Sequence, residues 1–148
     1  MPLTAVRETY RDVVDSAYAL AAEAAKDPAG PGLAHARRMV AQAVARALPV
    51  RERCLIAPLR ASRVPEHREC ARQLIARTLQ SRLNTIETNA RWTTQTIAAD
   101  PAGYRAAVAD FIRDIEARIA EEIRTIHPLV LAAHATPASD QADRATAA

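Results

Sequence analysis

Apolar side chains recur along this chain at alternating steps of three and four residues, and this spacing constrains the fold more than any other feature. It places them on one face of an α-helix, whereas a strand would need a period of two. Further stripes begin near Leu33, near His67 and at Val108, and the one from His67 predicts an inner face that continues through Leu83 and Ile86. Helices with one apolar face must bury it against one another, so we predict an all-α fold, an antiparallel four-helix bundle. The clearest stripe is the one from Val108 to Ile126, and the one nearest the N-terminus is Val6, Tyr10, Val13, Ala17, Leu20 and Ala24.

Helix-breaking residues separate these stripes. Residues 27–32 read Asp-Pro-Ala-Gly-Pro-Gly, Pro65 suits the first turn of a helix, and Asp100-Pro101 combines an N-cap acid with proline at the first helical position. Pro49 has no N–H to donate and predicts a kink in the second helix. We therefore expect the bundle to span residues 1–134. Residues 135–148 have nothing to bury, and we expect them to be disordered.

Composition narrows the class of protein further. The 148 residues suit one domain, and their formal net charge is +3. Arginines are interleaved with apolar residues, a pattern typical of solvated helix faces, so nucleic-acid binding is not expected. Cys54 and Cys70 form no paired motif, which indicates reduced thiols. No segment has the apolar length of a signal peptide core or a membrane span, so we expect a cytoplasmic protein without a membrane partner.

A short motif recurs near the ends of the second and fourth predicted helices. Glu52 and Glu122 each lie six residues before a closing proline, and a Glu66-His67 pair lies between them. This arrangement resembles the hemerythrin-like (HHE) family, in which each of these two helices carries His-x-x-x-Glu, then an apolar stretch and a proline. The resemblance covers residues 6–131 and rests on helix order, spacing and these short motifs.

The resemblance implies a non-haem di-iron site, but most of the required ligands are missing. Leu48 and Arg118 occupy the positions of two histidines, and Tyr10 lies near the place of a third. No intact His-x-x-x-Glu occurs anywhere in the chain. We therefore predict no metal site and no cofactor. The residues that remain as fallback metal ligands are Glu52, His67 and Glu122.

Arg118 suggests a replacement for the missing metal. Two carboxylates buried without a cation would be costly or would become protonated. Arg118 lies one turn before Glu122, so we expect its guanidinium to bridge Glu122 and Glu52 inside the bundle. We expect His67 to be buried and bonded to one of these acids. Tyr10 is expected to be a core aromatic residue with a satisfied hydroxyl.

The other chemically active side chains have structural interpretations. His127 and His134 lie at or beyond a helix end, and His35 lies in a first helical turn, so all three are expected at the surface. Cys54 and Cys70 are interpreted as packing residues, because no histidine is positioned to activate either thiol. Trp92 is expected to seal one end of the bundle.

Three classes of function are left open. The favoured one is a metal-free binding or interaction protein, with a protein partner or a second copy of the chain. The second is a small-molecule enzyme or ligand carrier whose polar cluster occupies the old metal cavity. The third is an iron protein with an atypical carboxylate-rich site that handles oxygen or a redox signal. For the enzyme, the catalytic candidates are Tyr10, Glu52, His67, Arg118 and Glu122.

Overall fold

The computed structural model describes residues 2–28 and 30–135. Every regular element in these ranges is helical and none is a strand, which confirms the all-α prediction. The tail predicted to be disordered lies outside the described residues, apart from Ala135. The elements are α1 (Pro2–Lys26), α2 (Pro31–Arg51), the π-helical segment η1 (Glu52–Ile56), α3 (Ala57–Ala61), α4 (Pro65–Arg91), α5 (Thr94–Ala99), α6 (Pro101–Thr125) and α7 (His127–Ala135).

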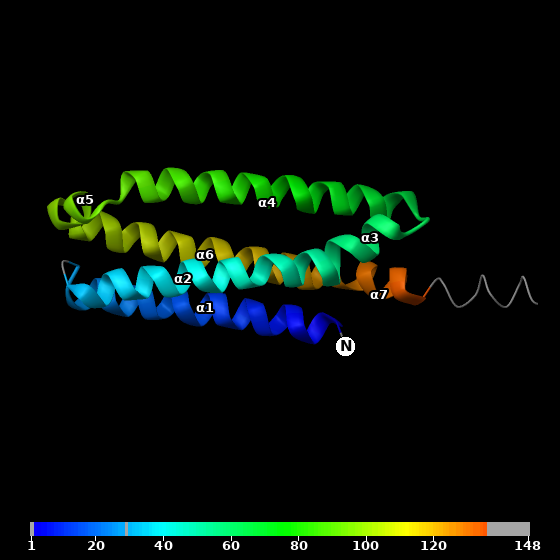
Figure 1. Ribbon diagram of the computed structural model, residues 1–148, viewed down its shortest axis with the longest axis horizontal. Helices are drawn as coiled ribbons and strands as arrows, with labels where there is room; N and C mark the ends of the chain where they lie inside the picture. The colour runs from blue at the N-terminus through cyan, green and yellow to red at the C-terminus, as the bar shows by residue number, and fades with distance from the viewer. Residues whose placement is uncertain (1, 29, 136–148) are drawn as a thin grey trace, which may run out of the picture.

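The four long helices run along one axis, and successive ones point in opposite directions (Figure 1). α1 packs against both α2 and α6, while α4 packs chiefly against α3, η1 and α7 near its own N-terminal end. α5 lies at the opposite end of the molecule, beside the start of α6 (Figure 1). The long helices therefore form a packed group of three, with α4 attached mainly at one end.

The helices begin where local chemistry favours a start. Pro31, Pro65 and Pro101 each occupy a first-turn position, where the missing N–H costs no hydrogen bond. The Asp100 carboxylate accepts a hydrogen bond from the backbone N–H of Gly103 at 2.9 Å and caps α6. Sequence reasoning did not identify the break after Arg91, where a Thr93 capping box opens α5.

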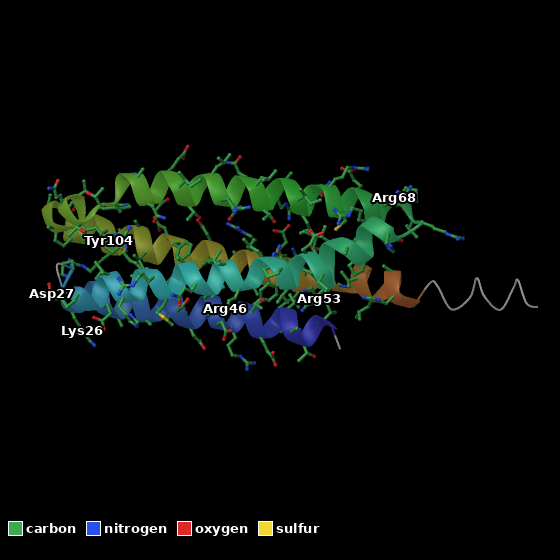
Figure 2. The ribbon with its side chains drawn as sticks, viewed as in Figure 1. Lys26, Asp27, Arg46, Arg53, Arg68 and Tyr104 are labelled. Atoms are coloured by element: carbon green, nitrogen blue, oxygen red, sulfur yellow. The ribbon has the colours of Figure 1, made fainter. Side chains whose placement is uncertain are left out.

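Two apolar cores stabilise the molecule. One joins the start of α1 to η1, α3, the first half of α4 and α7. The other joins the end of α1 to α2, α5 and the first half of α6, and it contains Trp92 packed edge-on against Tyr104. Figure 2 shows Tyr104 near the α5 end, with Arg68 at the other end of the molecule. The predicted role of Trp92 as a seal at one end agrees with this placement.

Pro49 acts on the helix in an unexpected way. The predicted kink takes the form of five π-helical residues, Glu52–Ile56, directly after the proline-containing turn of α2. Pro49 lies inside α2 without ending it, and the ladder widens in the next turn, where the Ala57 N–H bonds to the Glu52 carbonyl. Pro58 follows this wide turn; it has no N–H to offer the Cys54 carbonyl four residues before it and crowds that carbonyl. The wider turn places three successive side chains in the core, those of Cys54, Leu55 and Ile56. Arg51, the last residue of α2, lies directly before this segment.

The far half of α4 differs from the prediction. Leu83 and Ile86 were expected on the inner face, but the structure exposes 56% of Leu83 and 65% of Ile86. The buried residues of α4 are His67, Ala71 and Leu74, all in its first half. At about 100° per residue, Leu83 lies on the opposite side of the helix from Leu74. The inner-face prediction is therefore wrong for Leu83 and Ile86, although the helix itself continues to Arg91.

This asymmetry predicts unequal local stability along α4. The side chains of residues 82–91 are all exposed, on every face of the helix. Residues 67–75, in contrast, pack into an apolar core. In dilute protein, the backbone amides of residues 82–91 should exchange with protection factors roughly tenfold or more below those of residues 67–75. Exchange read by mass spectrometry on short peptides measures this. Equal protection of both halves would show that α4 opens only with the whole domain.

Candidate functional site

Four polar side chains from four different helices meet in the interior. Tyr10 comes from α1, Arg51 from the end of α2, Glu122 from α6 and His127 from the start of α7. Glu122 is 3% exposed and His127 2% exposed, and Tyr10 is also buried. We call these four residues the buried polar cluster. Because each comes from a separate helix, the cluster ties the relative positions of those helices together.

An ion pair between Arg51 and Glu122 dominates the cluster. Arg51 Nη1 donates to Glu122 Oε2 at 2.6 Å, and Arg51 Nη2 donates to Glu122 Oε1 at 2.7 Å. This bidentate arrangement matches the planar guanidinium to both carboxylate oxygens and is the strongest geometry for such a pair. The Arg51 side chain is 17% exposed and that of Glu122 4% exposed, so the pair lies largely out of water.

Tyr10 and His127 complete the cluster. The Tyr10 hydroxyl donates to Glu122 Oε2 and lies 3.4 Å from His127 Nε2. The Tyr10 and His127 rings are stacked, with their centroids 5.9 Å apart. Because the tyrosine proton points to Glu122, His127 Nε2 acts as the donor toward the tyrosine oxygen. His127 Nδ1 is then an acceptor, and within the described residues it is buried with no hydrogen-bond partner.

Each member of the ion pair stabilises the charged form of the other. Burial by itself raises the pKa of the Glu122 carboxyl, but the hydrogen bonds and charge of Arg51 outweigh it and hold that pKa below its ordinary value. Burial lowers the pKa of Arg51, and Glu122 outweighs this too, so the pKa of the guanidinium is raised. Glu122 is therefore a carboxylate and Arg51 a cation at neutral pH.

Tyr10 and His127 are held in their neutral forms. Burial first, and then the neighbouring Glu122 charge, raises the pKa of the Tyr10 hydroxyl far above its ordinary value. Burial lowers the pKa of His127, and the positive charges of Arg7 and Arg51 lower it further against the opposing effect of Glu122. A tyrosine that keeps its proton and a histidine that resists one are suited to a structural hydrogen-bond network.

The predicted site residues are only partly brought together. Tyr10 and Glu122 are in direct contact, and Tyr10 is the predicted core aromatic with a satisfied hydroxyl. Glu52 lies at the surface, where its carboxylate pairs with Arg60 at 2.6 Å. His67 is buried as predicted, but its Nδ1 lies 2.8 Å from the Ser62 hydroxyl oxygen, so it contacts neither predicted acid by that nitrogen.

The predicted role of Arg118 is wrong. Its side chain is exposed, and its guanidinium donates to the Ser81 hydroxyl of α4 at 2.8 Å. The cation that neutralises Glu122 is Arg51, and Glu52 needs none inside the protein. The physical idea of an internal cation fits the structure, but its assignment to Arg118 does not, since Arg118 lies at the exposed edge of α6 and extends to Ser81 of α4.

Sequence reasoning missed two members of the cluster. Arg51 lies four residues beyond Ala47, so it extends the buried stripe of α2, and this spacing was a usable signal. His127 was predicted at the surface because a proline follows it, and that prediction is wrong. It begins α7 directly after the break at Ile126, and its ring is buried against Tyr10 of α1. His35 and His134 are exposed, as predicted.

The fallback metal ligands do not converge. Across residues 2–28 and 30–135, no three His, Cys, Asp or Glu side chains are grouped in a way that could hold a metal ion. Glu122 already accepts from Arg51 and Tyr10, and Glu52 faces solvent. A hollow of about 300 Å³ between the η1 region and α4 reaches Arg51, and its other lining residues are Leu48, Pro49, Glu52, Ile56, Thr78 and Arg82.

Comparison with known proteins yields no relative. The chain matches no protein-family model, no curated protein and no solved structure. None of the helices in the described ranges has the length and apolarity needed to cross a membrane. The interpretation of the cluster therefore depends on its own geometry.

Removing the internal cation should destabilise the protein strongly. Arg51→Met leaves the Glu122 carboxylate buried without its charge partner, which typically costs about 3–5 kcal/mol of unfolding free energy. Arg118→Met is the matched control on an exposed arginine and should change it by less than about 0.5 kcal/mol. Urea melts of the two variants measure both changes.

A double variant tests whether the loss comes from the stranded carboxylate. Arg51→Met combined with Glu122→Gln should recover part of the stability lost by Arg51→Met alone, because the neutral amide no longer needs a cation. If Arg51→Met and Arg118→Met lowered the unfolding free energy equally, the assignment of Arg51 as the internal cation would be refuted.

Stability should fall as the solution is acidified. The folded pKa of His127 lies below the value in the unfolded chain, so the unfolded state binds the extra proton more readily. The stabilisation is full above the ordinary histidine pKa and is lost as the pH falls below it. Glu122, whose folded pKa is also lowered, continues the loss at lower pH. His127→Phe should flatten the decline in unfolding free energy between about pH 7 and 5.5, measured by urea melts across this range.

Proposed function

We propose that this chain is a metal-free interaction protein, with a four-helix, hemerythrin-like arrangement whose centre is stabilised by an ion pair instead of a metal. Two of the positions that the resemblance assigns to a metal site, Tyr10 and Glu122, are in direct contact. Arg51 supplies the positive charge beside them. The ion pair at this position is the observation that carries the proposal.

The interior leaves little capacity for chemistry. Both carboxylate oxygens of Glu122 accept from Arg51, and one also accepts from Tyr10. General acid–base catalysis needs a group with a pKa near the working pH and access to substrate. Here the Tyr10 pKa is raised and the Glu122 pKa lowered, so both groups are moved away from neutrality. These features favour a structural role for the cluster.

The surface, in contrast, offers a clear binding feature. Leu79, Leu83 and Ile86 on α4 are each more than half exposed. Single exposed apolar residues are ordinary, but a row of them on one helix is typical of an interaction site. α4 packs on its own chain mainly through α3, η1 and α7, so this row has no internal partner among the described elements.

One observation keeps the ligand-carrier alternative open. The hollow of about 300 Å³ reaches the edge of Arg51 and is also lined by Arg82, so it offers positive charge to a small anion. A ligand that bound there would compete with Glu122 for Arg51. Its volume lies at the lower end of the range for small-molecule pockets.

Crosslinking in living cells tests the interaction function. A photoreactive phenylalanine analogue at position 83 of the full chain should give discrete adducts on illumination. The matched control is the same analogue at Leu131 on α7, which is 45% exposed against 56% for Leu83. The expected result is adducts from position 83 that position 131 does not give.

The identity of the adduct, read by mass spectrometry, decides among the functions. Either a second copy of the chain or one recurrent partner protein supports the interaction function. The absence of any adduct specific to position 83 contradicts it. About two irons per chain in protein from iron-replete cells would instead establish the iron-protein alternative.

A further inference from the structure

We infer that the partner of α4 is a second copy of this chain, with two α4 helices paired side by side and parallel. This inference rests on the proposed interaction function and names its partner. Its basis is a heptad pattern on the exposed half of the helix. The members of the stripe are Ala76, Leu79, Leu83, Ile86 and Ala90, all exposed and spaced by three, four, three and four residues. We call these five residues the α4 stripe.

The spacing is that of a coiled-coil seam. Ala76, Leu83 and Ala90 occupy a positions, and Leu79 and Ile86 occupy d positions. Burial of the leucines and isoleucine against a partner removes apolar surface from water, whereas their own chain leaves them exposed. The α4 stripe lies about a third of a turn from the face that α4 packs on its own domain. A second helix therefore approaches from outside, without displacing α3, η1 or α7 from their contacts with α4.

Two charged residues select a copy of the same helix as the partner. Arg82 and Glu87 flank the α4 stripe on opposite sides, at g and e positions five residues apart. Both are exposed, and the structure gives neither of them a hydrogen bond or an ion pair in the described part of the chain. In a parallel pair, Arg82 of one copy lies beside Glu87 of the other, and symmetry forms this contact twice.

The same charges decide the orientation and the number of helices. An antiparallel pair centred on Leu79 and Leu83 would place Arg82 of one copy close to Arg82 of the other, which is repulsive. The remaining e and g positions, Gln80 and Asn89, are polar. A stripe of this width packs against one partner helix. A trimer or tetramer needs a wider apolar face on each helix.

The expected association is weak and reversible. The α4 stripe spans about two heptads, or roughly 20 Å of helix. Such a contact lies below the size of a standard stable interface. The pair should therefore form at high local concentration and dissociate on dilution, and it should order the exposed half of α4 as it forms.

Sedimentation of the full chain over a range of concentrations tests the inference. Wild type should show a monomer–dimer equilibrium, and Leu83→Asp should abolish it, while Leu131→Asp should leave it unchanged. Arg82→Glu and Glu87→Arg should each weaken association about tenfold, because two attractive contacts become repulsive. The double reversal should restore it to within about threefold of wild type, since the contacts are re-formed with the signs exchanged.

Circular dichroism melts of each variant confirm that folding is unchanged, as expected for substitutions at exposed positions. Wild type that stays monomeric at all concentrations overturns the inference. So does a double reversal that associates no better than the single variants, which would exclude parallel pairing. Crosslinking at position 83 separates the two proposals: adducts with another protein alone leave the interaction function standing and reject self-pairing.

Discussion

The bidentate ion pair between Arg51 and Glu122 is the interaction on which the rest of this interior depends. A carboxylate that is 3% exposed cannot remain charged in an apolar core without a partner. Arg51 supplies that partner from the end of α2, and Tyr10 adds a hydrogen bond from α1. The geometry that satisfies Glu122 therefore fixes how α1, α2 and α6 meet. A buried pair is weak as a net source of stability, but it penalises every arrangement that separates its members.

Arg51 continues the buried stripe of α2, four residues after Ala47. A regular helix through this region would continue with one residue inward per turn, but the π-helical segment after Pro49 places Cys54, Leu55 and Ile56 all in the core. Arg51 lies just before the widened turn and faces Glu122, while Glu52 faces Arg60 and solvent. Adjacent charged residues where α2 ends thus have opposite environments, with Arg51 inside and Glu52 at the surface.

In α4, by contrast, only the first half packs into the interior. Its first half is buried by His67, Ala71 and Leu74, and its second half presents Leu79, Leu83 and Ile86 to solvent. The side chains of the second half that continue the buried face are polar, including Thr78 and Thr85. α6 reaches this part of α4 through polar contacts, such as Arg118 with Ser81 and Glu121 with Arg77. The helix is therefore held at one end and left with an apolar surface at the other.

The amino-acid sequence by itself determined the helical class, most helix starts and the inner face of α1, because periodicity and capping act over a few neighbouring residues. It also identified Tyr10 from its apolar stripe and Glu122 from its spacing before a closing proline. The choice of Arg51 over Arg118, the burial of His127 and the exposure of Leu83 were decided only by the tertiary structure. Each of these depends on what lies opposite the side chain: Glu122 opposite Arg51, Tyr10 beside His127, and no packed neighbour among the described elements beside Leu83. Such features arise from contacts between residues distant in the chain, which local spacing does not record.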